Sequence, residues 1–282
     1  KKIEKFSFKN KAEIDKAMEE VKSKNFNIND ISSKVVNRNP SGPFTTSTLQ
    51  QVSSGRLGFG ASRTMQIAQK LYQGIEIDGE TIGLITYMRT DGTNLSTDAI
   101  DTFRKYIKNE FGDEYVPDNA ASYSGKKAKN AQEAHEAIRP TDIMRAPDTV
   151  KKYLSPDQHK LYDLIWSRAL SSQMKPAQFD RNTITITSDD NGTICKASGS
   201  VIKFDGFLKV MKDTKKDDDE DILPEMNKGP VNIESLLDEQ HFTQPPPRYS
   251  EASLVKKLEE LGIGRPSTYA SIISVISTRG YA

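Results

Sequence analysis

The order of the predicted secondary structure constrains the fold of this chain more than any other feature of its sequence. Residues 28–36 and 182–210 alternate polar and apolar side chains as strands do, and between them lies a mostly helical stretch over residues 47–173. Within the second β region, the dipeptide Asn191-Gly192 is a typical hairpin turn. Helical sequence with β sequence on both sides indicates that one domain is inserted into another.

These patterns predict an α+β multidomain protein with three parts. Residues 1–46 and 176–244 are expected to form a discontinuous, β-rich arch domain, and the chain leaves and re-enters it through two strands that act as a hinge. Residues 47–175 are expected to form the inserted, mostly helical domain. A stiff spacer of three prolines at 245–247 begins the last part, a partial helical piece over residues 245–282.

Two glycine-containing turns have the same surroundings. Residues 57–60 (LGFG) precede a helix expected to start near Ser62, and residues 261–264 (LGIG) precede one expected to start near Pro266. Each turn also follows an apolar helical pattern, so both segments resemble helix-turn-helix units, which often bind nucleic acid. A generic pair of antiparallel helices with a glycine turn fits the same pattern.

The strongest chemical signal is the segment ITYMRTD at residues 85–91. If this segment is a short strand, Tyr87 and Arg89 project from the same face. A tyrosine hydroxyl has a pKa near ~10 and is a poor nucleophile unless its oxyanion is stabilised, and an arginine can do this while it also holds a phosphate. The pair points to phosphoryl transfer, although an ordinary strand with a half-buried tyrosine and a solvated arginine is the better explanation while these two residues are taken alone.

Four further blocks occur around this segment in a fixed order. They are GPFTTSTLQQ at residues 42–51, QEAHEAIRP at 132–140, YSEASLV at 249–255 and GIGRPSTYA at 262–270. Together with residues 85–91, these blocks closely resemble type IA DNA topoisomerases of the bacterial topoisomerase I kind. The resemblance extends from about residue 40 to the end of the chain, with one departure at Gly92, where such enzymes usually carry serine.

The resemblance implies catalytic roles for three residues. Tyr87 is the nucleophile that attacks a phosphodiester in single-stranded DNA, which gives a 5′-phosphotyrosyl link and a free 3′-hydroxyl. Arg89 stabilises the charge that develops on the phosphorus centre, and His135 lies beside the nucleophile and helps to position DNA. Passage of a second strand through the gap, followed by resealing without ATP, relaxes negatively supercoiled DNA.

The turn before the last expected helix is a candidate phosphate site. Pro266 suits the first position of a helix, where its missing amide hydrogen is not needed. The amides of Ser267, Thr268 and Tyr269 would then lack acceptors within the helix, at the positive end of its dipole. The resemblance implies that Arg265 and Thr268 hold the DNA backbone near the cleavage site, and Ser267 joins them as a candidate contact.

A second polar surface is expected around the histidine block. If residues 131–138 are helical and the helix ends before Pro140, Gln132, His135 and Arg139 share one face. Histidine and arginine on one face suit a phosphate contact or a proton transfer, which makes Gln132 and Arg139 candidates for DNA binding. A single helical histidine is also common as an ordinary surface residue.

A metal cofactor is implied by the resemblance, but outside these residues. In the family, Mg²⁺ is held by acidic residues of a Toprim domain that precedes this region and also contributes a lysine near the phosphate. No motif of this chain matches that site, since the acidic run at residues 217–221 is expected to be a solvated loop. We therefore expect no metal ligands here, a central fragment that is inactive alone, and two partners: single-stranded DNA and the Toprim domain of the same polypeptide.

Composition excludes several other classes. The 282 residues suffice for two or three domains, and 40 basic against 39 acidic residues leave no overall basic field, so DNA binding must depend on local patches. The single Cys195 excludes a disulfide framework and a Cys/His zinc cluster within these residues. No apolar run approaches the ~20 residues of a membrane span, so a cytoplasmic monomer without membrane contact is expected.

Two alternative functions remain to be weighed against a topoisomerase. A non-catalytic nucleic-acid-binding module built on helix-turn-helix units would not need Tyr87 and Arg89 beside the other blocks. A relaxase-type tyrosine nuclease would need clustered metal-binding histidines, but His135, His159 and His241 are not spaced in that way. His159 and His241 are therefore expected to be structural.

Overall fold

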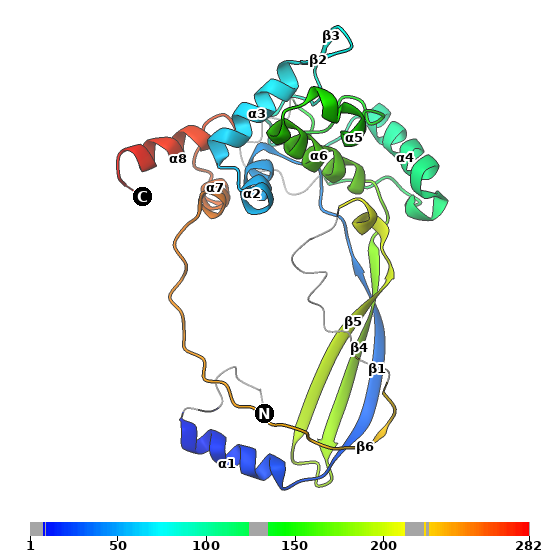
Figure 1. Cartoon of the computed structure of the whole chain (residues 1–282), viewed down its shortest axis with the longest axis vertical. Coiled ribbons are helices and arrows are strands. Elements are labelled where there is room, and N and C mark those ends of the chain that lie inside the picture. The colour runs from blue at the N-terminus through cyan, green and yellow to red at the C-terminus, as the bar shows by residue number, and fades with distance from the viewer. Residues whose placement is uncertain (1–7, 9, 124–134, 212–222, 224–225, 282) are drawn as a thin grey trace. The chain divides into compact units, whose positions relative to one another are not determined.

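The structure is a computed structural model that describes residues 8, 10–123, 135–211, 223 and 226–281 (Figure 1). The chain divides into two compact units. The sheet unit comprises Lys1–Asn37, Gln178–Phe204 and Thr214–Pro246. The helical unit comprises Arg38–Ala177, Asp205–Asp213 and Pro247–Ala282. Most of the helical unit is therefore inserted between strands of the sheet unit in sequence, its last part follows the sheet unit, and the chain has mixed helix and sheet content.

Among its described residues, the sheet unit contains one helix and a four-stranded sheet. Its elements are α1 (Lys11–Lys22), β1 (Phe26–Arg38), β4 (Ala177–Ser188), β5 (Ile194–Phe204) and β6 (Gly229–Val231). The strand order is β5-β4-β1-β6, with β4 and β5 antiparallel and β6 antiparallel to β1. The two long segments expected to be strands are thus neighbours in one sheet, although they are far apart in the sequence.

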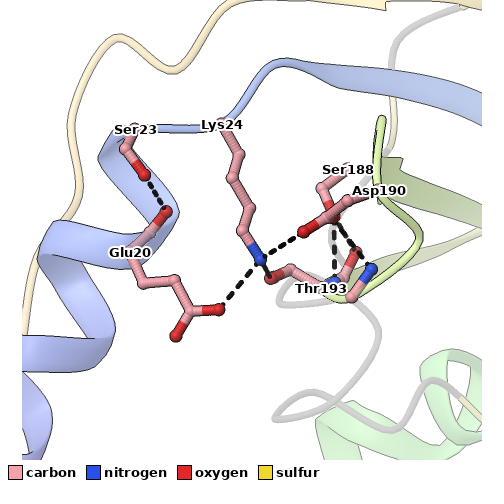
Figure 2. Close-up of polar contacts among 7 residues, drawn as sticks. Glu20, Ser23, Lys24, Ser188, Asp190 and Thr193 are labelled. Atoms are coloured by element: carbon pink, nitrogen blue, oxygen red, sulfur yellow. Dashed lines mark hydrogen bonds and ion pairs between the residues drawn. The ribbon is translucent and has the colours of Figure 1, made fainter.

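The turn between β4 and β5 is fixed by the side chains that surround it. Asn191 has a φ of 56°, the left-handed conformation that the Asn-Gly pair predicts, so the hairpin expectation is confirmed. Figure 2 shows Lys24 between Glu20 of α1 and Asp190 of the turn, with its Nζ 2.9 Å and 3.0 Å from their carboxylates. The Ser188 hydroxyl, the Gly192 amide and Lys24 lower the pKa of Asp190. These contacts join the turn to the end of α1.

The helical unit contains seven α-helices among its described residues. These are α2 (Thr46–Leu57), α3 (Ala61–Gln73), α4 (Thr97–Phe111), α5 (Pro147–Val150), α6 (Pro156–Ser171), α7 (Glu251–Glu260) and α8 (Tyr269–Thr278). Short 3₁₀ helices lie at Asp113–Tyr115, Lys151–Tyr153 and Gly206–Lys209, and β2 (Ile75–Ile77) and β3 (Glu80–Ile82) form a small hairpin. Helix α6 packs against α3, α2 and α5 (Figure 1).

The core of the helical unit joins a helix to two loops. Leu161, Tyr162 and Ile165 of α6 are fully buried. Phe44, in the loop before α2, and Ile138, in the loop after His135, are fully buried as well. Burial of such side chains is the main favourable contribution to folding. Because Phe44 and Ile138 also form a β-bridge, the core fixes the loop before α2 to the loop that follows His135.

The two glycine turns expected from the sequence occur in two matching helix pairs. Gly58 follows α2 and Gly262 follows α7, each with a φ of 68°, which glycine adopts without strain. Each pair also begins with a hydroxyl capping box, made by Thr45 with Thr48 in one pair and by Ser250 with Ser253 in the other. Both helix pairs, α2 with α3 and α7 with α8, are therefore helix-turn-helix pairs.

The second pair packs on the first, so residues after the triple proline belong to the helical unit and do not stand as a separate piece. The amide of Ala61, at the start of α3, donates to the Glu251 carboxylate at 2.7 Å, and the Ser47 hydroxyl donates to Glu259 at 2.6 Å. A small apolar cluster closes the contact, formed by Ala61, Val255, Tyr269 and Ile273.

Two secondary-structure predictions from the sequence are wrong for the described residues. A helix is predicted over residues 131–138, but the described residues from His135 onward are not helical, because the amides of Ala137 and Ile138 donate to Asn94 O and Phe44 O. The expected strand around Tyr87 is also absent in the described chain, where only Ile85 forms a β-bridge. In both segments, hydrogen bonds to distant loops replace regular local ones.

Candidate active site

The segment that carries Tyr87 is held on one side by the block containing Arg139. The amide of Thr86 donates to Arg139 O at 2.9 Å, and the Thr86 hydroxyl donates to Ala137 O at 2.8 Å. The same hydroxyl accepts the Arg139 amide at 3.0 Å. Three hydrogen bonds at one threonine thus fix the residue before Tyr87 to the loop that follows His135.

The other side of the segment is held by Thr46 at the start of α2. Thr46 is fully buried, and its hydroxyl donates to Met88 O at 2.7 Å and accepts the Thr90 amide at 2.8 Å. Met88 itself is buried, whereas Tyr87 before it is half-buried and Arg89 after it is exposed. The backbone therefore turns Met88 into the core and leaves Tyr87 and Arg89 accessible, as a strand would have done.

The Tyr87 ring lies between two other rings. The centroid of the His135 ring is 5.1 Å from that of Tyr87, with the planes tilted by 56°. The ring of Tyr72, in the last turn of α3, meets Tyr87 edge-on with a centroid distance of 5.4 Å. His135 is thus brought to Tyr87 as predicted from the sequence, whereas Tyr72 was not anticipated.

The loop after His135 is stiffened by a bidentate ion pair. Arg139 donates to both oxygens of Glu136, at 2.9 Å and 2.8 Å, and to its own neighbour Pro140 O at 2.9 Å. Burial opposes ionisation of Glu136, but the bonds and charge of Arg139 and the Ser96 amide outweigh it, so the pKa of Glu136 is lowered. The guanidinium of Arg139 is therefore already engaged within the protein, although the sequence pointed to it as a DNA contact.

A polar cleft of about 640 Å³ lies between α3 and α8 and reaches Arg89. Its polar lining from α3 consists of Ser62, Gln66, Gln69, Lys70 and Gln73, and its lining from the start and face of α8 includes Ser267, Ser271 and Ser274. Among the described residues that line it, Lys70 and Arg89 carry positive charge and none is acidic. Met65 and Ala270 complete the lining, so the cleft presents apolar surface as well as polar groups and two positive charges.

The turn before α8 differs from the expected phosphate site. The helix begins at Tyr269, and the amides of Thr268 and Tyr269 both donate to Arg265 O, so they are not free for a ligand. The Thr268 hydroxyl accepts the Arg265 amide at 2.8 Å. The side chains of Arg265 and Ser267 are exposed, and Ser267 lines the cleft. Any contact with an anion here would thus come from these side chains.

Of the candidate site residues predicted from the sequence, Gln132 lies outside the described residues. Others lie in the cleft beside residues that the sequence analysis did not identify. Arg89 and Ser267 line one cleft, although 178 residues of sequence separate them (267 − 89). The glutamines at 66, 69 and 73 follow helical spacing on α3, a polar stripe that the sequence could have revealed. The position of Tyr72 against Tyr87 depends on tertiary packing and has no local signal.

Neither a metal site nor a membrane-spanning helix is found among the described residues. Among these residues, no group of three or more His, Cys, Asp or Glu side chains is arranged to hold a metal ion. The acidic run at 217–221 lies outside the described residues. Among the helices that are described, none combines the length and the apolar character required to span a membrane.

Comparisons with known proteins agree on one family. A family profile described as DNA topoisomerase matches residues 1–282. DNA topoisomerase 1 of Rickettsia felis is 51% identical over 284 residues, covering 99% of this chain and 36% of that protein, and DNA topoisomerase 1 of Xylella fastidiosa strain 9a5c is 48% identical over 278 residues, covering 96% and 34%. Full-length topoisomerase I from Thermotoga maritima superposes with a TM-score of 0.78 at 40% identity, covering 94% of this chain and 43% of that one. The chain thus spans about a third of the length of the curated relatives it matches.

Proposed function

This chain belongs to the bacterial type IA DNA topoisomerases, and from that premise we propose that it supplies the nucleophile and part of the DNA-binding surface of an enzyme that relaxes negatively supercoiled DNA. The observation that carries the proposal is the placement of Tyr87. Its ring lies against His135, on a segment fixed by Thr46 and Thr86, and Arg89 follows it at the edge of a polar cleft. An ordinary surface tyrosine would not need this support.

The proposed reaction is a transesterification at Tyr87. The phenolic oxygen loses its proton and forms a bond to the phosphorus of a DNA phosphodiester, while the bond from phosphorus to the 3′-oxygen breaks. The product is a 5′-phosphotyrosyl link and a free 3′-hydroxyl, and attack by that hydroxyl reverses the step. Arg89 stabilises the additional negative charge around phosphorus, and His135 positions the DNA beside the phenol.

The cleft between α3 and α8 is proposed to hold the single strand that leads to Tyr87. Its serine and glutamine side chains can donate to phosphate and base oxygens, while Lys70 and Arg89 supply positive charge and no acidic group among the described lining residues repels the backbone. The exposed side chains of Arg265 and Ser267 extend this surface before α8, whereas the Thr268 hydroxyl is bonded to the backbone of Arg265. Because the overall charge of the chain is only +1, binding is expected to depend on these local groups.

The remaining parts of the enzyme are also proposals. We propose that Mg²⁺ and a lysine near the phosphate are held by a Toprim domain of a longer polypeptide, as the resemblance implies. These 282 residues alone are then expected not to cleave DNA. Strand passage would use a hinge at the ends of β1 and β4, where the chain leaves and re-enters the sheet unit. The full-length parent, the longer polypeptide that contains these residues, is expected to be a cytoplasmic monomer.

Covalent trapping of DNA tests this proposal. The full-length parent with Mg²⁺ is incubated with a labelled single-stranded oligonucleotide, and protein–DNA adducts are separated on a denaturing gel. We expect an adduct with the wild type and none with Tyr87→Phe, which should still bind the oligonucleotide because only the attacking oxygen is removed. Binding without any wild-type adduct would instead favour a non-catalytic nucleic-acid-binding module.

A further inference from the structure

The Tyr72 ring is fixed by the backbone at the end of α3. The amide of Leu84 donates to Leu71 O at 2.8 Å, which joins this helix end to the segment that leads to Tyr87. Gly83 approaches so closely that a Cβ placed on it would lie 2.7 Å from the Tyr72 carbonyl oxygen. This hydrogen bond and close approach hold the end of α3, with Tyr72, against the segment that leads to Tyr87.

The Tyr87 side chain is oriented by rings more than by hydrogen bonds. Within the described part of the chain, its hydroxyl has no hydrogen-bond partner, whereas its ring meets His135 on one side and Tyr72 edge-on. Edge-to-face aromatic pairs are favourable beyond the burial of their area. Tyr72 is 40% exposed, so removal of its ring would open this side of Tyr87 to solvent.

We propose that Tyr72 is a positioning residue for the nucleophile: its ring restrains Tyr87 in the orientation from which the phenolic oxygen attacks. The role belongs to the ring and not to the hydroxyl, since the contact is between ring edges and faces. Loss of the ring would let Tyr87 populate other rotamers, and small displacements of a reacting group reduce rates strongly. This proposal rests on the function proposed for Tyr87.

Single-turnover cleavage by the full-length parent, at saturating oligonucleotide, measures the effect. We expect Tyr72→Leu to form the Tyr87 adduct about ten-fold more slowly, because the interaction free energy of an edge-to-face aromatic pair corresponds to a rate change of about this size. The dissociation constant for DNA should be unchanged. Tyr72→Phe keeps the ring and should cleave at the wild-type rate. The matched control is Tyr106→Leu, which removes another edge-on pair, between Tyr106 and Trp166 at 5.6 Å.

An unchanged rate in Tyr72→Leu would overturn the proposal, as would an equal loss in Tyr72→Phe. A raised dissociation constant with a normal rate at saturation would instead make Tyr72 a DNA-stacking residue.

A second measurement does not depend on cleavage. With fluorotyrosine incorporated, the ¹⁹F resonance of Tyr87, assigned by its loss in Tyr87→Phe, should shift in Tyr72→Leu and stay unchanged in Tyr106→Leu. A resonance that does not respond to Tyr72→Leu would refute the ring contact. Absence of any wild-type adduct would refute the function proposed for Tyr87 and leave this test of the contact intact.

Discussion

The carbonyl oxygen of His135 lies where a side chain at position 92 would begin: a Cβ built on Gly92 would be 2.3 Å from it. The Gly92 amide also donates to the Thr90 hydroxyl at 2.9 Å, which keeps this turn tight. The His135 loop thus approaches this turn more closely than any side chain at position 92 would allow.

Substitution of Gly92 by alanine should therefore displace the His135 loop. The new methyl group would meet backbone and not a flexible side chain, so we expect destabilisation of about 1–3 kcal/mol, the usual range for overpacking. Urea unfolding of the chain measures it. Gly55→Ala is the control, because a Cβ at this helical position meets nothing within 4 Å, and it should be neutral or stabilising by up to about 1 kcal/mol. Equal stability of Gly92→Ala and wild type would contradict the close approach.

Glu136→Gln should remove a pH-dependent part of the stability. Despite burial, which raises it, the pKa of Glu136 is lowered below the ordinary 4.5 by Arg139 and the Ser96 amide. A lowered folded-state pKa stabilises the protein above the ordinary value, and this contribution is lost as the pH falls through the folded-state pKa. The difference in melting temperature between wild type and Glu136→Gln should therefore be largest near neutrality and shrink below pH 4.5. A difference that stays constant with pH would argue against the ion pair.

Arg89→Ala in the full-length parent should slow adduct formation by a factor on the order of 10²–10³, the scale for loss of one charge-stabilising donor. DNA binding should weaken only slightly, because other groups of the cleft remain. Quench-flow cleavage at saturating oligonucleotide gives the rate. Arg63→Ala is the control, since Arg63 is an arginine of the neighbouring helix α3 that pairs with Asp157. If both variants cleave at the wild-type rate, Arg89 is an ordinary solvated residue.

Binding of single-stranded DNA by the chain should weaken as salt rises, because the contacts are with phosphates. Loss of one phosphate contact in Arg265→Ala should lower the slope of log K against log salt by about 0.7. Arg139→Ala should leave the slope unchanged and lower stability, since its guanidinium is bound to Glu136. Fluorescence anisotropy with a labelled oligonucleotide measures both. A slope altered by Arg139→Ala and not by Arg265→Ala would reverse the two roles.

The parts that the sequence predicted depend on local physical chemistry. The Asn191-Gly192 hairpin follows from a dipeptide that tolerates the left-handed conformation, and the paired helices around Gly58 and Gly262 follow from glycine and apolar spacing. The accessibility of Tyr87 on one side of buried Met88 followed from alternation alone. For these features, neighbouring residues contain most of the necessary information.

The parts that the sequence missed depend on partners far along the chain. Residues 135–138 have helical spacing, but the amides of Ala137 and Ile138 donate to Asn94 O and Phe44 O, so the segment is not helical. The turn after Arg265 uses amides that a simple helix start would leave free. The contact of Tyr72 with Tyr87 likewise requires the close approach of Gly83 to α3. Such contacts cannot be inferred from periodicity within one segment.

The most direct test of the central claim is to identify the amino acid that becomes linked to DNA. Adduct from the full-length parent, formed with a single-stranded oligonucleotide, is digested with nuclease and protease, and the peptides are sequenced by mass spectrometry. The account predicts a nucleotide attached through its 5′-phosphate to Tyr87 and to no other tyrosine. A nucleotide on any other residue, or a 3′-phosphate link at Tyr87, would contradict it.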